Sequence, residues 1–200
     1  MGGQAIIYVD DTNVIIKAPN LVSATTSATN ILNEISKLFT SLNLAINWEK
    51  INTMLFCNKK NMTDIHINGN VVKPIQEVNF LGLILTNGLK WKTHIQTCIS
   101  KINRGIFLLT QTAQILNSGK NLRAYNAHVH SHITHGTLIW GSPNLNKKYT
   151  EAIFIKQKKA IRILIFGYNK SRQSCRELFK QLNILTCIST HLYQCFKFLD

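Results

Sequence analysis

Two neighbouring carboxylates inside an apolar stretch constrain this chain more than any other feature. Asp10-Asp11 separates two short β-favouring runs, Ala5–Val9 and Thr12–Ile16. Such runs, joined by two turn-forming residues, predict a tight β-hairpin. Carboxylates about 4 Å apart repel each other, and both stay ionised readily only beside a cation. The pattern therefore predicts either a metal site at the hairpin tip or a solvent-exposed Asp-Asp turn, which is a common arrangement.

The metal interpretation points to Mg²⁺, because proteins hold this ion through one or two carboxylates together with substrate phosphates. Two such ions can activate an attacking 3′-hydroxyl and stabilise leaving pyrophosphate, which is polymerase chemistry. A rigid hairpin tip would fix Asp10 and Asp11 where a primer end and a triphosphate meet.

The first 88 residues combine strand and helix patterns. Leu21 to Leu42 carries apolar residues at three- and four-residue steps, which predicts a long amphipathic helix. Strands are predicted at Thr53–Phe56, at Ile65–Ile67 and Val71–Val72 around the turn Asn68-Gly69-Asn70, and at Val78–Leu85.

Residues 89–200 have a helical pattern throughout. The first predicted helix opens at a Thr93–Gln96 capping box and ends near Asn117–Gly119, and the next runs from Leu122 to Gly136. A third follows the Gly141-Ser142-Pro143 loop, with Ile153, Ala160, Ile161 and Leu164 facing inward. Two more are predicted, one from a Ser174–Glu177 capping box and one from His191 to Phe198. The expected fold class is therefore α+β, with a mixed domain over 1–88 and a helical domain over 89–200.

The charge balance indicates an anionic partner. The chain has 23 Lys and Arg against 9 Asp and Glu, a formal net charge of +14 and a pI near 9.8. Such a surplus favours nucleic acid or an anionic membrane surface. No apolar run approaches about 18 residues, so we expect no membrane partner.

The N-terminus and the cysteines bear on the compartment. Asp10 and Asp11 interrupt the first apolar stretch, which is therefore not a signal peptide. Five scattered cysteines include no Cys-x-x-Cys pair, so a cysteine zinc site is not expected. We expect reduced thiols in an intracellular, cytoplasmic or nuclear protein that is not secreted.

Several segments, in the right order, resemble the reverse transcriptases of non-LTR (LINE-type, jockey-like) retrotransposons. Tyr8-Val9-Asp10-Asp11 resembles the catalytic YxDD hairpin of that family, and Phe80-Leu81-Gly82-Leu83 resembles its primer-grip turn. Further resemblance lies in Leu42–Phe56, Leu89–Ile95, Tyr125–Trp140, Gln157–Arg162 and Ser174–Leu185. The resemblance covers nearly the whole chain and implies a partial palm over 1–88, followed by a thumb and further helices over 89–200.

The resemblance also implies roles for individual residues. Asp10 and Asp11 would be catalytic and would bind two Mg²⁺ ions, while Lys50 would act near the incoming deoxynucleoside triphosphate. RNA template and DNA primer would be bound by Tyr8, Phe80, Leu81, Gly82, Trp91, Lys92, Lys101 and Arg104. Structural alternatives stay open, since Lys50 can be an exposed lysine, Gly82 an ordinary turn glycine, and Trp91 a buried anchor between palm and thumb.

Two clusters admit more than one interpretation. His128 and His132 are four residues apart within a run that includes His130 and His135, a spacing that can hold zinc but also suits packing or phosphate contact. A helix carrying Lys156, Lys158, Lys159 and Arg162 is either a solvated face or a phosphate-binding face. Thumb cations at Lys90, Lys120 and Arg123 would address phosphates in the same sequence-independent way.

The expected function is that of a reverse-transcriptase fragment. In the family a further metal-binding Asp precedes the hairpin, whereas Asp64 follows it, so the Mg²⁺ site is expected to be incomplete in these residues. We expect two-metal nucleotidyl transfer in the intact enzyme and inactivity of the fragment alone. The alternatives are an inert remnant acting as a basic nucleic-acid-binding module, and an unrelated basic α+β scaffold with an incidental Asp-Asp turn.

Overall fold

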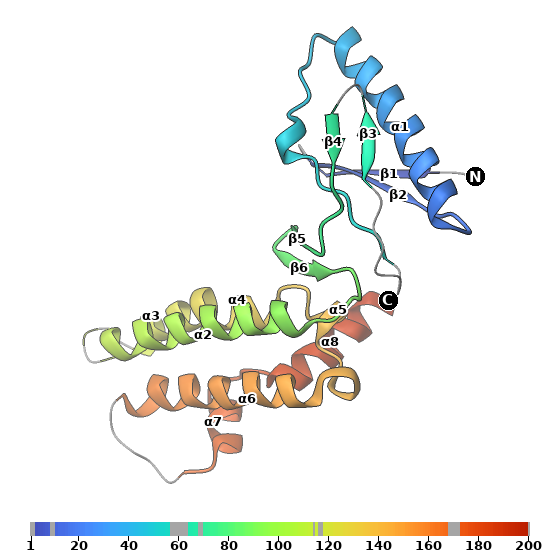
Figure 1. Ribbon diagram of the computed structural model, residues 1–200. Coiled ribbons are helices and arrows are strands. Elements are labelled where there is room, and N and C mark those ends of the chain that lie inside the picture. The colour runs from blue at the N-terminus through green and yellow to red at the C-terminus, as the bar shows by residue number, and fades with distance from the viewer. Residues whose placement is uncertain are drawn as a thin grey trace. The chain divides into compact units, whose positions relative to one another are not determined.

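The computed structural model describes residues 3–8, 11–56, 64–67, 70–113, 115, 118–167 and 173–199. The chain combines helices with small two-stranded sheets, so the expected α+β class is confirmed (Figure 1). It divides into two compact units. The mixed unit comprises residues 1–80 and 85–89, and the helical unit comprises residues 81–84 and 90–200.

The mixed unit contains two antiparallel hairpins and one long helix. Its elements are β1 (Gly3–Tyr8), β2 (Asp11–Ile16), α1 (Leu21–Ser41), a 3₁₀ turn (Trp48–Lys50), β3 (Ile65–Ile67), β4 (Asn70–Val72) and β5 (Glu77–Phe80). Helix α1 begins after Asn20, whose side chain accepts a hydrogen bond from the Ser23 N–H at 2.8 Å. This N-cap satisfies one of the amide groups that the first turn leaves without an intrahelical partner.

A small core holds this unit together. Ala28 of α1 packs with Ile65 of β3 and Val72 of β4, and all three side chains are buried. Partly buried side chains extend the cluster, namely Ile16, Leu32, Trp48 and Ile51. The predicted helix and both predicted hairpins are therefore present in the described residues, although the turn residues Asn68 and Gly69 lie outside them.

The predicted strand Thr53–Phe56 is wrong. Only Thr53 pairs, in an isolated parallel bridge to Pro74, and its carbonyl accepts a hydrogen bond from the Ile75 N–H at 2.8 Å. Proline has no N–H to donate, so a ladder cannot continue through Pro74.

The predicted single strand Val78–Leu85 is also wrong. It is divided into β5 and β6 (Leu83–Thr86), because Leu81 and Gly82 adopt left-handed φ values of 46° and 80°. Two successive positive φ angles reverse the chain between the strands.

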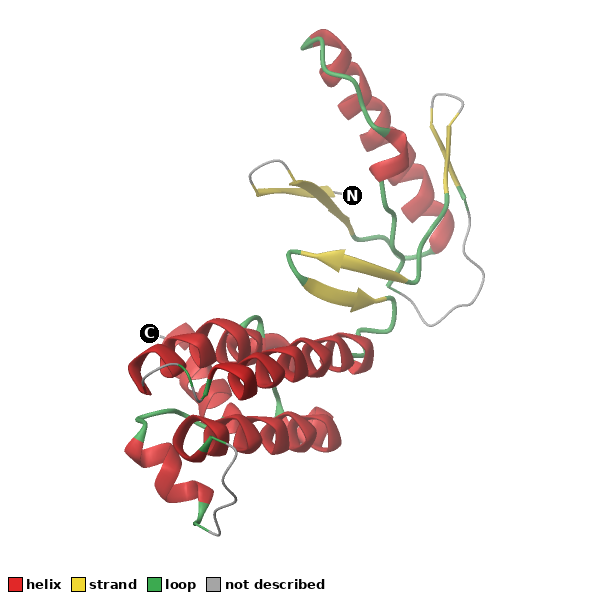
Figure 2. Ribbon diagram, turned by 90° about the vertical axis from the view of Figure 1, so that its left-hand side faces the viewer, coloured by secondary structure: helices red, strands yellow, loops and turns green. Residues whose placement is uncertain are grey.

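The helical unit contains the remaining elements. These are α2 (Lys92–Thr112), α3 (Ser118–Tyr125), a π-helical segment (Asn126–His130), α4 (Ser131–Thr134), α5 (Thr137–Trp140), α6 (Pro143–Phe166), α7 (Cys175–Gln181) and α8 (Cys187–Leu199). Figure 2 shows these helices in red. Helix α2 packs along α6 and α3, and α6 also contacts α7 and α8.

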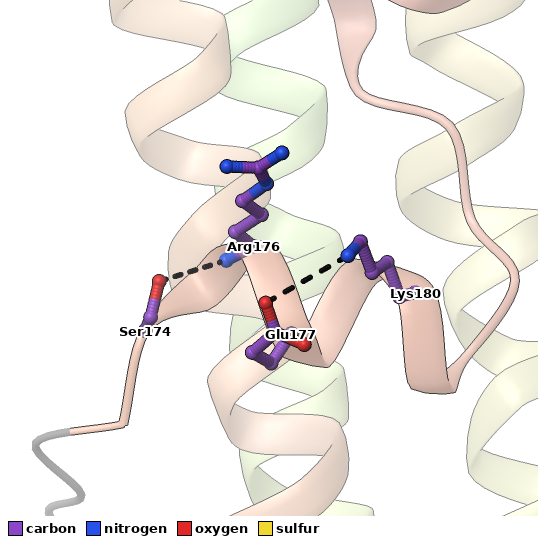
Figure 3. A network of polar contacts seen from close by, with 4 residues as sticks. All are labelled: Ser174, Arg176, Glu177 and Lys180. Carbon is purple, nitrogen blue, oxygen red and sulfur yellow. Dashed lines mark hydrogen bonds and ion pairs between the residues drawn. The ribbon is translucent and has the colours of Figure 1, made fainter.

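Several predicted helix ends need correction. Helix α2 begins after Trp91, without a side-chain cap, so the capping box at Thr93 is wrong, and α2 ends at Thr112 rather than near residue 117. Helix α8 begins four residues earlier than the predicted His191. The Ser174 cap is present, since its side chain accepts from the Arg176 N–H at 3.3 Å (Figure 3).

The predicted helix from Leu122 to Gly136 is interrupted by the π-helical segment. Here α2 approaches very closely, and a Cβ added to Gly105 would overlap the carbonyl oxygen of His128. Only glycine allows this approach of the two backbones. A single π-helical turn has the same pattern of apolar residues as the α-helix around it, so the sequence does not reveal it.

A buried amide joins three parts of the helical unit. The side chain of Gln157 on α6 is fully buried. Its Nε2 donates to the Tyr125 hydroxyl at 3.0 Å and to the Leu185 carbonyl at 2.9 Å, and its Oε1 accepts from the Cys187 N–H at 2.8 Å. Every polar atom of the amide is therefore used, and α6 is held to α3 and to the start of α8.

We predict that Gln157→Leu lowers the free energy of unfolding by about 2 to 4 kcal/mol, because it leaves the buried Cys187 N–H and Leu185 carbonyl without partners. Urea unfolding followed by helical circular dichroism measures the decrease. The matched control is Gln111→Leu at an exposed position of α2, which we expect to change stability by less than about 0.5 kcal/mol. Equal effects of the two substitutions would contradict the role of the amide.

Candidate nucleic-acid interface

The β1–β2 hairpin brings the predicted Tyr8 and Asp11 opposite each other. The strands pair antiparallel from Gly3 with Ile16 to Tyr8 with Asp11. Asp11 is thus the first residue of β2, whereas the sequence pattern places it in the connection. Asp10 lies outside the described residues, as do the side chains of Tyr8 and Asp11. The Mg²⁺ site therefore stays a prediction.

Lys50 ends the 3₁₀ turn after Trp48. The Asn47 side chain caps this turn by accepting from the Glu49 N–H at 3.1 Å. Lys50 is exposed, while Trp48 packs against the core of the mixed unit. This geometry is compatible with an exposed lysine and with a triphosphate contact alike.

The predicted primer-grip turn is anchored by a histidine. His135 Nε2 lies 3.0 Å from the Leu81 carbonyl oxygen, and a Cβ added to Gly82 would lie 2.9 Å from the same nitrogen. Since the carbonyl only accepts, His135 must donate through Nε2. Two features therefore favour glycine at position 82. Its φ is 80°, which side chains disfavour, and the His135 imidazole occupies the space that a Cβ would need. Phe80, the residue before the turn, ends β5.

A second histidine anchors the strand that follows the turn. The buried His94 accepts at Nδ1 from the Ile84 N–H at 3.3 Å, and its Nε2 lies 3.4 Å from Cys98 Sγ. A neutral imidazole that accepts at Nδ1 carries its proton on Nε2, which therefore points to the sulfur. Burial first, then the charges of His135 and Lys101, lower the pKa of His94 from 6.5 to about 4. His94 is neutral at physiological pH.

Trp91 stands at the start of α2 and is half-buried. Its ring meets the imidazole of His94 edge-on, with 6.2 Å between the ring centroids. Trp91 therefore contributes to the packing around His94. An anchor between palm and thumb and a contact to a base both stay predictions for this residue.

The predicted α2 cations do not share one face. Lys101 and Arg104 are three residues apart, which places them on neighbouring parts of the helix surface. Lys92 precedes Lys101 by nine residues, about two and a half turns, and therefore lies on the opposite side of α2. Lys92 therefore does not belong to the same surface of α2 as Lys101 and Arg104.

The four clustered histidines divide between packing and the charged surface. His130 is partly buried and stacks on Tyr125, with ring centroids 6.0 Å apart. The pKa of His132 is lowered by burial first, and then by Lys101, His128, Arg104 and His135. Lys101 and Arg104 of α2 thus place two positive charges near His132. Across the described residues, no group of three metal-ligating side chains is present.

The surplus of positive charge is confined to one part of the chain. Residues 90–200 contain 17 of the 23 Lys and Arg and 3 of the 9 acidic residues, so they carry the whole net charge of +14. Residues 1–89 contain six of each sign and are neutral overall. The sequence pattern singles out the α6 cations but gives no signal for Arg176 and Lys180 of α7, which the fold brings to the same surface.

Comparison with known proteins supports a reverse-transcriptase-like origin. The chain is 25% identical over 160 residues to the RNA-directed DNA polymerase from mobile element jockey of Drosophila melanogaster. The match covers 78% of this chain but only 17% of that protein's length. No protein-family profile matches the chain, and no solved structure matches it. In the part of the chain that the structure describes, no helix has the length and apolar character needed to span a membrane.

We predict that the free energy of unfolding falls as the pH is lowered from 6.5 to about 4, since His94 has a lowered pKa in the folded protein. The unfolded chain takes up this proton first, so the stability present above pH 6.5 is lost through that range. The full shift corresponds to about 3 kcal/mol.

The matched variant is His94→Asn, which keeps an acceptor for the Ile84 N–H but does not titrate. Denaturant unfolding at several pH values should show a flatter pH profile for this variant than for the wild type. His66→Asn, at an exposed position of β3, is the control and should preserve the wild-type slope. If His94→Asn keeps the wild-type dependence of unfolding free energy on pH, His94 is not the group responsible for it.

Proposed function

We propose that this chain is part of a non-LTR reverse transcriptase, in which the mixed unit belongs to the palm and the helical unit is the thumb and the helices that follow it. The observation that carries the proposal is the match to the jockey RNA-directed DNA polymerase over 78% of the chain. The tyrosine and aspartate paired at the end of the β1–β2 hairpin, and the basic helical unit, are the features that such a protein requires.

The helical unit would bind the RNA–DNA duplex through phosphates. Lys101 and Arg104 supply charge on α2, and His135 holds the Leu81-Gly82 turn that would approach the primer. Such contacts address the backbone and carry no sequence information. Binding by this surface is therefore sequence-independent and weakens with salt.

The mixed unit would supply two of the three metal-binding carboxylates in the intact enzyme. Asp10 and Asp11 are oxygen donors, which suit Mg²⁺, and Mg²⁺ would stabilise charge on the reacting phosphates. Lys50 would lie near the triphosphate. With the third carboxylate supplied by another part of the intact enzyme, residues 1–200 alone would act as a nucleic-acid-binding module. The alternative of a basic scaffold with an incidental Asp-Asp turn accounts for the charge but not for the match to the jockey polymerase.

We expect the purified chain to bind an RNA–DNA hybrid with an affinity that falls as salt rises. Lys101→Gln with Arg104→Gln should reduce the slope of log affinity against log salt by about one for each phosphate that is no longer bound. Fluorescence anisotropy over a salt series measures both quantities.

The control removes equal charge from the mixed unit. Lys37→Gln with Lys73→Gln changes two exposed cations there and should leave the slope unchanged. Binding that is insensitive to salt, or an equal reduction of the slope in both double variants, would contradict the proposed interface.

We further expect no primer extension by the isolated chain with Mg²⁺ or Mn²⁺, because two carboxylates hold the second ion poorly. The measurement is incorporation of labelled nucleotide on a primed RNA template. Incorporation that Asp10→Ala abolishes would show a complete active site in these residues and would overturn this expectation. Incorporation that survives Asp10→Ala comes from a contaminating polymerase, and the chain itself is then still inactive in primer extension.

A further inference from the structure

A surface pocket of about 710 Å³ lies in the helical unit, between α6, α7 and the segment that leads into α8. Four cations line it, and no carboxylate is among the described lining residues. The cations are Lys158 and Arg162 of α6 together with Arg176 and Lys180 of α7. The α2 cations assigned to the duplex do not line this pocket.

The positive charge in the pocket is largely unneutralised. Within the described part of the chain, one of these cations forms an ion pair with a carboxylate. It is Lys180, whose Nζ lies 3.9 Å from Glu177 Oε1, and both groups are exposed. Such a pair contributes little in water. Figure 3 shows the guanidinium of Arg176 pointing away from Glu177. The pocket therefore favours an anion.

Part of the pocket lining is apolar. Phe154 and Phe179 lie with their ring centroids 6.1 Å apart, and Ile184 and Leu185 add to this lining. Lys158 Nζ lies 4.4 Å from the centre of the Phe154 ring. A site that combines an aromatic surface with Lys and Arg matches a nucleotide, which has a flat base and a negatively charged phosphate.

Side chains rather than backbone amides would hold the anion. At the start of α8, the Cys187 N–H already donates to Gln157, the Ser189 N–H to the Thr186 hydroxyl, and the Thr190 N–H to the Thr186 carbonyl. These amides are not available to a ligand. Recognition would therefore depend on Arg162 and Arg176, which can bind a phosphate through paired hydrogen bonds.

We propose that this pocket binds an unpaired nucleotide of a single-stranded nucleic-acid segment, with its phosphates at Arg162 and Arg176 and its base against Phe154. A duplex cannot use the pocket in this way, because its bases are stacked and paired. The proposal rests on the proposed function for the class of ligand, but it concerns residues separate from the α2 surface.

The test compares a short fluorescent oligo(U) with a blunt RNA–DNA hybrid. Arg162→Gln with Arg176→Gln should weaken oligo(U) binding roughly tenfold and hybrid binding by less than about twofold. The control is Lys156→Gln with Lys159→Gln, which removes the same charge from α6 outside the pocket and should affect oligo(U) by less than about twofold. Helical circular dichroism verifies that both variants fold.

Phe154→Leu separates stacking from charge. It keeps an apolar side chain in the lining and should weaken oligo(U) binding about fivefold without changing the salt slope. Arg162→Gln alone should instead reduce that slope.

Equally weakened oligo(U) binding in the pocket and control variants, or unchanged binding in both, would overturn the proposal. A wild-type chain that binds oligo(U) but no hybrid at any salt concentration would refute the proposed duplex interface and support the pocket. Hybrid binding without oligo(U) binding would refute the pocket alone.

Discussion

The helical unit depends on the fully buried amide of Gln157. A buried polar group is costly unless its hydrogen bonds are complete, and this one donates two and accepts one. Its partners are a buried tyrosine hydroxyl, a loop carbonyl and the first amide of α8. Burial is also the main reason that the pKa of Tyr125 rises to about 12, so the hydroxyl stays protonated beside the amide. The contact fixes how α6 lies against α3 and α8.

The opposite, exposed side of α6 carries cationic side chains. Gln157 points inward, while Lys159 and Arg162 are exposed on the same helix. Repulsion among cations on one unit opposes folding, and the satisfied core has to offset it. A phosphate ligand would relieve that repulsion. Binding of the proposed ligand would therefore stabilise the helical unit.

Local patterns predicted much of this fold because they report local causes. The β1–β2 and β3–β4 hairpins, the long α1 helix and the Ser174 cap each follow from a few neighbouring residues. The π-helical segment does not, since it lies where Gly105 of α2 approaches the His128 carbonyl, and these residues are far apart in the sequence. Gln157 sits among lysines and arginine in the sequence, where a glutamine is expected to be exposed.

The pocket needs α6 and α7 side by side, which no helical pattern reveals. The predicted metal-binding role of Asp10 and Asp11 rests on resemblance, because such a site requires ligands that are distant in sequence.

Two histidines hold the Leu81-Gly82 turn and the strand after it in opposite roles, His135 as a donor and His94 as an acceptor. His94 fills its role only while neutral, a state maintained chiefly by burial and secondarily by the positive charges of His135 and Lys101. The hydrogen bond that anchors the strand after the turn therefore depends on the burial of one imidazole.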